Sequence, residues 1–129
     1  MYGRRTKYGN RKVCINGIQF DSKHEAEHYI LLANLEKHGK IHDLQLQKKY
    51  TLVPAQYEES TEIYSKGIHK GEKKKGKLIE RECAYLADFD YYDSLGRHIV
   101  EDAKGMRTKE YIIKRKLMLY VHGIRVMEV

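Results

Sequence analysis

The fold is decided by residues 83–104, CAYLADFDYYDSLGRHIVEDAK. Both ends of this stretch are rich in β-branched and aromatic residues, and DSLG between them has the composition of a tight turn. We therefore expect two antiparallel strands, residues 83–92 and 97–104. Side chains two residues apart on a strand point the same way, so Asp102 and Lys104 should share a face, and Asp88 can meet them across the pair.

The segment before these strands predicts another hairpin and a helix. VCINGIQF places Asn-Gly between two short β-prone runs, which favours a hairpin with a two-residue turn from about residue 12 to residue 20. Ser22 and Glu25 then form an S-x-x-E capping box, and Gly39 is suited to a left-handed helix end. A first helix is therefore expected over residues 22–38.

Further strand and helix signals complete the predicted order of elements. Alternating residues after the first helix predict a strand through Val53, just before the only proline. Beyond residue 104, Thr108 can cap a second helix that ends at Gly123 and precedes a last strand, residues 124–129. The order is α-β-β-β-α-β with an N-terminal hairpin, which corresponds to a mixed sheet flanked by helices in the α/β (α+β) class.

Composition indicates one domain with a polyanionic partner. A chain of 129 residues with 41% hydrophobic residues can build one core, so a single domain is expected over residues 1–129. Residues 1–12 are expected to form a flexible basic arm. Residues 57–82 are crowded with charge and glycine, and they predict either a long insertion or a charged hairpin. The net charge of +7 favours a polyanion without distinguishing DNA, RNA or an anionic membrane.

Several protein classes are disfavoured by what the chain lacks. No stretch approaches the roughly 18 consecutive apolar residues of a membrane helix, and no apolar segment like that of a signal peptide follows the basic start. Cys14 and Cys83 are far apart and have no CxxC partner, which argues against a zinc knuckle or a disulfide framework. We expect a soluble, cytoplasmic protein.

The chemistry of the predicted strand pair points to phosphodiester hydrolysis. Two carboxylates that face each other, Asp88 and Asp102, repel unless a cation lies between them, and such oxygen ligands suit Mg²⁺ or Mn²⁺. A metal held there would polarise a phosphate and acidify a bound water, while Lys104 would orient that water and offset charge on phosphorus.

Four stretches carry a resemblance to a known nuclease superfamily: FDSKHEAEHYILL (residues 20–32), GKIHDLQLQKKYTL (39–52), YLADFDYYD (85–93) and VEDAKGMRTKEYIIKRK (100–116). Together with the order of elements they resemble the PD-(D/E)XK superfamily, which includes restriction endonucleases, Holliday-junction resolvases and a transposase endonuclease subunit. More narrowly, they resemble a family of short phage and prophage proteins assigned to it.

The resemblance implies a restriction-endonuclease-like core and a metal-dependent endonuclease that hydrolyses DNA in the bacterial host cell. Structure-specific cutting in phage recombination, replication or packaging is one option. It implies that Asp88, Asp102 and Glu25 hold Mg²⁺ or Mn²⁺ and that Lys104 is the catalytic lysine. Gln47 resembles a glutamine of relatives that would steady a metal-bound water, although an exposed strand amide is the alternative.

Three points about these residues stay open. Ala87 stands where the superfamily's name has proline, a proline that is often absent. Glu101 could replace Asp102 as the ligand if the strand bulges, although strict alternation with Lys104 favours Asp102. Glu25 is also explained by its capping box alone.

Basic and aromatic residues elsewhere in the chain are candidates for contacts with DNA phosphates. They are Arg4, Arg5, Lys73, Lys74, Lys75, Lys109, Tyr111 and Lys114. The alternative for each is a solvated surface. DNA is thus the expected partner, and paired cuts on two strands would favour a homodimer.

Two other functions compete with the nuclease. A basic nucleic-acid-binding module without catalysis would explain the charge alone. A zinc peptidase would use the H-E-x-x-H pattern from His24 to His28, yet this pattern falls in the first helical turn and no third ligand motif follows it.

Overall fold

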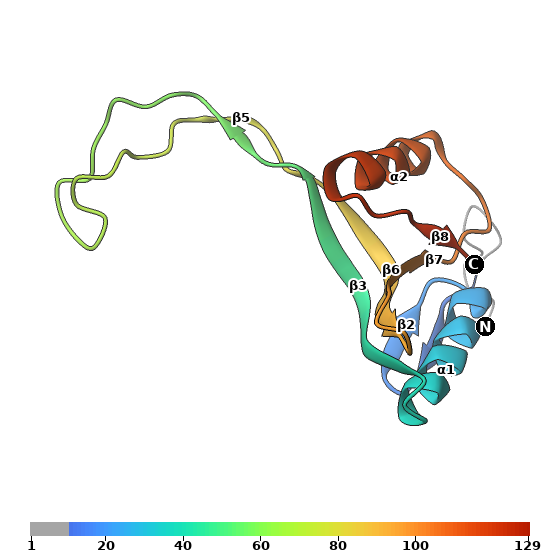
Figure 1. Ribbon diagram of the computed structural model, residues 1–129. Helices are drawn as coiled ribbons and strands as arrows, with labels where there is room; N and C mark the ends of the chain where they lie inside the picture. Colours follow the sequence, from blue (N-terminus) through green and yellow to red (C-terminus); the bar gives the residue numbers. More distant parts are fainter. Residues whose placement is uncertain (1–10) are drawn as a thin grey trace, which may run out of the picture.

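The computed structural model describes residues 11–129, so the expected contacts of Arg4 and Arg5 lie outside the described residues. It shows a mixed α+β fold with two helices, a four-stranded sheet and two smaller hairpins (Figure 1). The order of the main elements is the predicted one.

The N-terminal hairpin and the first helix form where the turn and cap residues predict them. β1 (Val13–Ile15) and β2 (Ile18–Phe20) are joined by Asn16 and Gly17, whose φ angles of 51° and 78° are those of a type I′ turn. α1 (Lys23–Lys37) begins after Ser22, whose side chain accepts the Glu25 backbone N–H at 3.1 Å. It ends before Gly39, which has a φ of 71°.

The main sheet has the strand order β3-β6-β7-β8. β3 (Ile41–Val53), β6 (Cys83–Asp93) and β7 (His98–Asp102) are antiparallel neighbours, and β8 (Met127–Glu128) runs parallel to β7. α2 (Lys109–His122) connects β7 to β8, with Thr108 as its N-cap and Gly123 as its left-handed C-cap. β8 is shorter than the expected strand over residues 124–129.

β7 also ends earlier than predicted. The expected strand reached Lys104, whereas pairing stops at Asp102 because the next backbone N–H, that of Ala103, donates to the Asp88 carboxylate at 2.9 Å. Lys104 therefore lies in the loop after β7, and its position does not follow from strand alternation.

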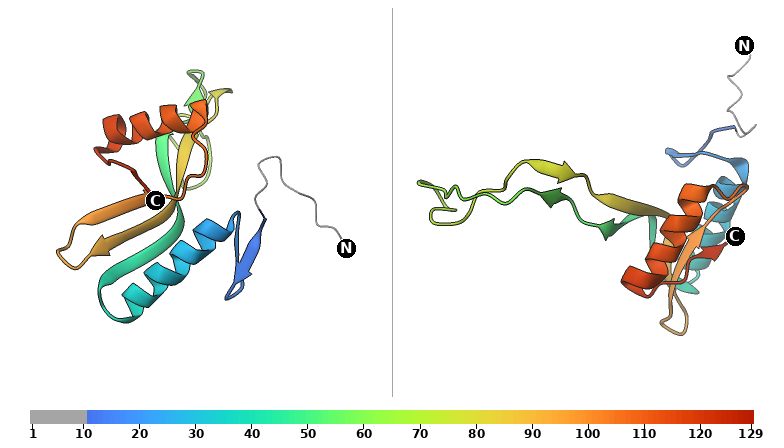
Figure 2. Two further views of the ribbon diagram at one scale, coloured as in Figure 1. Left: turned by 90° about the vertical axis from the view of Figure 1, so that its right-hand side faces the viewer. Right: turned by 90° about the horizontal axis from the view of Figure 1, so that it is seen from above.

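Each helix covers its own part of the sheet, and the two helices lie on opposite sides of the β6–β7 hairpin (Figure 2, left). The cluster under α2 comprises Leu52, Tyr85, Ala87, Val100, Tyr111, Met118 and Val126. The cluster under α1 comprises Leu32, Ile41, Phe89 and Tyr91. The end of β7 and the middle of β6 lie between these clusters, which is where the acidic residues converge.

The segment between β3 and β6 forms a long hairpin that projects from the body (Figures 1 and 2). It contains β4 (Gln56–Tyr57) and β5 (Leu78–Glu80), which pair antiparallel. Of the two structures that the sequence left open for residues 57–82, the structure has the charged hairpin. The described residues include no helix that is long and apolar enough to cross a membrane.

Candidate active site

Four acidic side chains are buried within the described part of the chain: Glu25, Asp90, Glu101 and Asp102. Burying a carboxylate is unfavourable unless it gains hydrogen bonds or an opposite charge. The partners of these four groups therefore separate structural carboxylates from candidate functional ones.

Asp90 and Glu101 are each paired with a histidine. His98 Nε2 lies 2.8 Å from Asp90 Oδ1, and the Tyr50 hydroxyl donates to the other Asp90 oxygen. His28 Nε2 lies 2.9 Å from Glu101 Oε1. Both carboxylates are thus satisfied by protein groups. Glu101 faces α1 rather than Lys104, so the structure gives no support to Glu101 in place of Asp102.

Asp102 is only partly satisfied. Its Oδ2 accepts the Tyr85 hydroxyl at 2.5 Å, and burial followed by this hydrogen bond raises the pKa of Tyr85 well above its usual range. Lys104 Nζ lies 3.2 Å from Asp102 Oδ1 as an ion pair. The geometry is not that of a hydrogen bond, so the buried Oδ1 has no hydrogen-bond partner among residues 11–129.

Asp88, on β6, lies beside the C-terminal end of β7 and accepts hydrogen bonds from two donors. Its Oδ2 accepts the Ala103 backbone N–H, and its Oδ1 accepts Gln47 Nε2 at 2.9 Å. Gln47 Nε2 also lies 3.4 Å from Glu25 Oε1, so one amide joins the two carboxylates. Gln47 has a φ of 52°, a left-handed conformation that non-glycine residues rarely adopt and that is enriched at functional sites.

The acidic groups resist being ionised together. Burial, and then the charge of Asp88, raises the pKa of Glu25 to about 7. Burial, and then Asp102, raises the pKa of Asp88 to about 6, although its bonds from Ala103 and Gln47 and the charge of Lys104 act in the opposite direction. A cation placed among these groups would relieve this repulsion.

The donor set fits Mg²⁺ or Mn²⁺. Asp88, Asp102 and Glu25 offer only carboxylate oxygens, which these hard cations prefer, and the buried Asp102 Oδ1 has no hydrogen-bond partner among residues 11–129. As the side chains stand, no three His, Cys, Asp or Glu groups in the described residues converge closely enough to hold an ion. The Gln47 amide lies between Glu25 and Asp88, so these two carboxylates are joined through it.

The site opens into a cleft of about 290 Å³ between β6, the end of β7 and α2. Asp88, Asp102 and Lys104 line it together with Thr108 and Lys114 from α2. Because Thr108 caps α2, the N-terminus of that helix faces the cleft, an arrangement that favours anions. Lys114 forms an ion pair with Glu110 at the rim, and exposed Lys109 lies on the same helix.

Tyr111 differs from the sequence-based expectation that it contacts DNA phosphates. Its ring is buried under Lys104, whose Nζ lies 4.4 Å from the ring centroid. Its hydroxyl donates to Glu128 Oε1 at 3.1 Å. Tyr111 is therefore placed to support Lys104 rather than to reach into solvent. Sequence reasoning missed both Tyr85 and Glu128, because no local pattern links them to Asp102 or Lys104.

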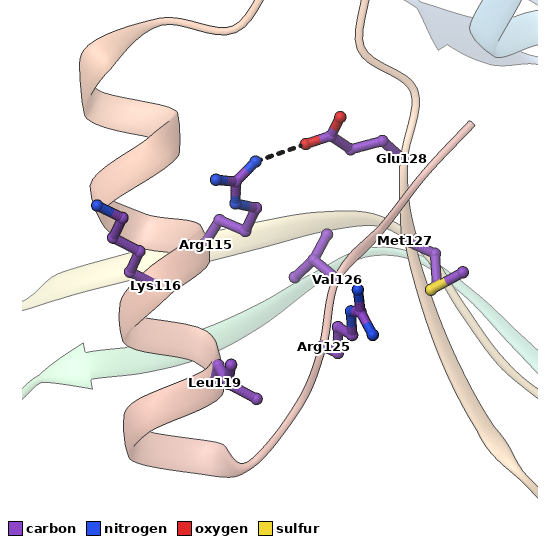
Figure 3. Close-up of a pocket in the computed structure, with 7 residues that line it drawn as sticks. All are labelled: Arg115, Lys116, Leu119, Arg125, Val126, Met127 and Glu128. Carbon is purple, nitrogen blue, oxygen red and sulfur yellow. Dashed lines mark hydrogen bonds and ion pairs between the residues drawn. The ribbon is translucent and has the colours of Figure 1, made fainter.

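A second, larger groove of about 610 Å³ runs between α2 and β8 (Figure 3). Its carboxylate, Glu128, is already held by Arg107 and by Arg115 at 3.0 Å, and these bonds, that from Arg107 most, lower the pKa of Glu128 below its usual range. None of the three candidate metal ligands, Glu25, Asp88 and Asp102, lines this groove. The smaller cleft is therefore the better candidate for the active site.

The H-E-x-x-H residues have separate partners. His24 Nε2 lies 2.9 Å from the Val129 carbonyl oxygen, whereas His28 pairs with Glu101. Glu25, between them, contacts Gln47. This arrangement gives no support to a zinc pair on α1. Lys73, Lys74 and Lys75 lie on the projecting hairpin and do not line the cleft.

Comparisons with known proteins give a family. Neither the curated proteins nor the solved structures yielded a match. One family model matches residues 5–126, nearly the whole chain, and the chain therefore belongs to the family described as "Protein of unknown function (DUF1064)".

Proposed function

We propose that the protein is a divalent-metal-dependent endonuclease that hydrolyses DNA phosphodiester bonds, as a member of the PD-(D/E)XK superfamily. One observation carries the proposal. Asp88, Asp102 and Lys104 line a single cleft, and the buried Asp102 has an oxygen without a hydrogen-bond partner among the described residues. Lys104 offsets the charge of this oxygen from 3.2 Å without a hydrogen bond, and a metal ion would complete its surroundings.

Asp88 and Asp102 would hold Mg²⁺ or Mn²⁺, with Glu25 as the third carboxylate. When bound, the ion supplies a Lewis acid for the scissile phosphate and lowers the pKa of a water. The chain's own groups set the positions of these ligands. Tyr85 fixes one Asp102 oxygen, and Gln47 holds Asp88 and Glu25 together.

Lys104 would offset the negative charge that grows on the phosphate during hydrolysis. Its side chain is 30% exposed and lies at the cleft, so its ammonium can face both Asp102 and a phosphate. The Tyr111 ring beneath it restricts its movement, and Glu128 fixes Tyr111. Preorganised positive charge of this kind stabilises the transition state more than the ground state.

DNA is the proposed substrate because of the charge around the cleft. Lys109 and Lys114 extend along α2 from the cap at Thr108, and phosphate contacts by such residues position a duplex without reading its sequence. Action in the cytoplasm of a bacterial host, on phage DNA, follows from the family resemblance. A homodimer would suit paired cuts on two strands.

Nicking of a supercoiled plasmid tests this proposal. The wild-type protein should nick in Mg²⁺ or Mn²⁺ and stop when a chelator is added, and Asp88→Asn and Asp102→Asn should each abolish nicking. Asp43→Asn is a matched control, because Asp43 is exposed and has a φ of 55°, which asparagine tolerates. Wild-type nicking rates in the two site variants would contradict the proposed active site.

The second candidate function is DNA binding without cleavage. It is favoured by the arrangement of the carboxylates, since no three of them stand close enough to hold an ion in the described residues. Under this alternative the protein would shift a labelled duplex in a gel but leave a plasmid intact at every Mg²⁺ and Mn²⁺ concentration.

A further inference from the structure

The projecting hairpin, residues 54–82, is an arm whose two halves run antiparallel to each other. Backbone hydrogen bonds between its two halves continue outward from β4 and β5: Glu58 N–H donates to the Lys77 carbonyl at 2.8 Å, and Lys74 N–H donates to the Glu62 carbonyl at 2.9 Å. Gly76 permits this close approach, because a Cβ there would lie 2.0 Å from the Glu58 carbonyl oxygen.

Charge is divided sharply along this arm. The outer half, residues 64–77, contains six lysines and one glutamate, whereas the inner parts, residues 54–63 and 78–82, contain five glutamates and one arginine. All residues from 61 to 82 except Gly76 are exposed. The arm therefore has a strongly positive outer half, and its inner parts, which form the root of the arm next to the body, are negative.

The lysines of the outer half are largely available for another molecule. Lys74 lies 3.9 Å from Glu62, a long and exposed ion pair that contributes little. Lys75 lies over the Tyr57 ring at 5.0 Å, which keeps its ammonium on the arm surface. Lys73 forms no ion pair within the described residues, nor do Lys66, Lys70 and Lys77.

The arm places these charges far from the cleft. Fifteen residues separate Lys73 from Asp88, and at about 3.3 Å per residue they span at most roughly 50 Å. One turn of B-DNA, about 10 base pairs, is roughly 34 Å long. The upper limit of this reach is therefore longer than one turn and corresponds to about 15 base pairs.

We propose that the outer half of the arm contacts backbone phosphates of a DNA duplex at the far end of this reach, more than one turn and at most about 15 base pairs from the bond that is cut. The substrate is then a DNA with a duplex flank of at least one turn on one side of the cleavage point. This inference rests on the proposed nuclease function. Duplex DNA is the occupant that the charge favours, because its phosphates match the lysines, whereas a root rich in glutamate would repel DNA that lay along the whole arm.

Binding to duplexes of graded length tests the arm. Fluorescently labelled duplexes of 8, 12, 16, 24 and 40 base pairs would be titrated with protein in Ca²⁺, and each Kd would be measured by anisotropy at 0.1 M salt. The informative quantity is the ratio of the Kd of the Lys73→Ala, Lys74→Ala, Lys75→Ala variant to that of wild type. A longer duplex offers more binding sites and lowers both Kd values by the same factor, so the ratio does not depend on the number of sites.

The expected ratio is near one at 8 base pairs and at least about tenfold from 16 base pairs upward, since each phosphate contact contributes up to about 0.9 log unit at this salt concentration. The salt slope on the 24-base-pair duplex should fall by up to about 2.7 in the same variant. A control variant, Lys12→Ala, Lys37→Ala, Lys40→Ala, makes the same change in net charge on the exposed body surface and should show one ratio at every length.

Two outcomes would overturn the inference. If the Kd ratio is the same at all duplex lengths, the lysines either contact DNA next to the cleft or do not contact DNA at all. If the triple lysine variant differs from wild type in molar mass by light scattering, and its Kd ratio does not change with duplex length, the arm binds a second copy of the chain instead of DNA. Wild-type plasmid nicking is scored separately, so length-dependent binding without nicking would refute the proposed nuclease while the arm remains a DNA grip.

Discussion

Asp88→Asn should make the metal-free protein more stable and the metal-bound protein less stable than wild type. Burial and the neighbouring Asp102 raise the pKa of Asp88 from 3.8 to about 6, so the ionised carboxylate destabilises the folded state at pH 7.5. At about 1.4 kcal/mol per pKa unit, this cost is at most roughly 3 kcal/mol. Asparagine removes the charge and keeps the shape.

The gain is reduced by a lost hydrogen bond. Asp88 accepts from both Ala103 N–H and Gln47 Nε2, and an asparagine has only one acceptor atom, so about 1 kcal/mol is lost again. A net gain of about 1–2 kcal/mol remains, which for a domain of this size raises Tm by roughly 5 °C. In wild type, a divalent ion at a hundred times its Kd adds about 2.7 kcal/mol, and the variant should lack this addition.

Thermal unfolding at pH 7.5 measures both halves of this prediction. Wild type, Asp88→Asn and the control Asp43→Asn would be melted in chelator and across a titration of Ca²⁺ or Mn²⁺. The order of Tm should invert for Asp88→Asn as metal is added, and the control should follow wild type. If Asp88→Asn is less stable than wild type by the same amount with and without metal, Asp88 holds neither a strained charge nor an ion.

Other variants separate the roles of neighbouring groups. Lys104→Ala should bind DNA nearly normally in Ca²⁺ yet cleave at least about a hundredfold more slowly in Mg²⁺ in single-turnover assays, and an unchanged rate would remove it from the chemistry. Glu25→Gln should fold normally but lose nicking by orders of magnitude, whereas full nicking would leave Glu25 only its place in the capping box. Because the folded pKa values of Asp88 (about 6) and Glu25 (about 7) are raised, the stability these groups contribute is full below about pH 4 and is lost as pH rises through 6–7. Urea midpoints of the metal-free protein should therefore fall from pH 5.5 to pH 8, and much less so in the Asp88→Asn, Glu25→Gln double variant.

Local signals in the sequence were enough to predict most elements. The Asn-Gly turn, the caps at Ser22 and Thr108 and the glycine ends of both helices act within a few residues, so they can be identified without knowledge of the tertiary structure. The proximity of Lys104 to Asp102 was also expected, but for a reason that proved wrong. The strand ends at Asp102, and the ion pair is made from the loop.

Contacts between distant parts of the chain could not be predicted in this way. On α2 the structure buries Tyr111 and Met118 but exposes the large apolar side chains of Leu119 and Tyr120. Those two buried residues are seven apart, so α2 packs through a narrow seam that periodicity alone does not locate. The pair of His28 and Glu101 spans 73 residues, and no local pattern indicates it.

The neighbouring carboxylates on β7 show how the fold separates structure from candidate function. Glu101 and Asp102 are adjacent and both buried, but strand alternation sends them to opposite faces. Glu101 meets His28 on α1 and is satisfied there, whereas Asp102 meets Tyr85 and Lys104 and keeps one oxygen without a hydrogen bond in the described part of the chain. Lys104 offsets the charge of that oxygen from 3.2 Å, but no donor among the described residues forms a hydrogen bond with it. Under the proposed function, a metal ion at Asp102 accounts for this difference between two adjacent buried acids.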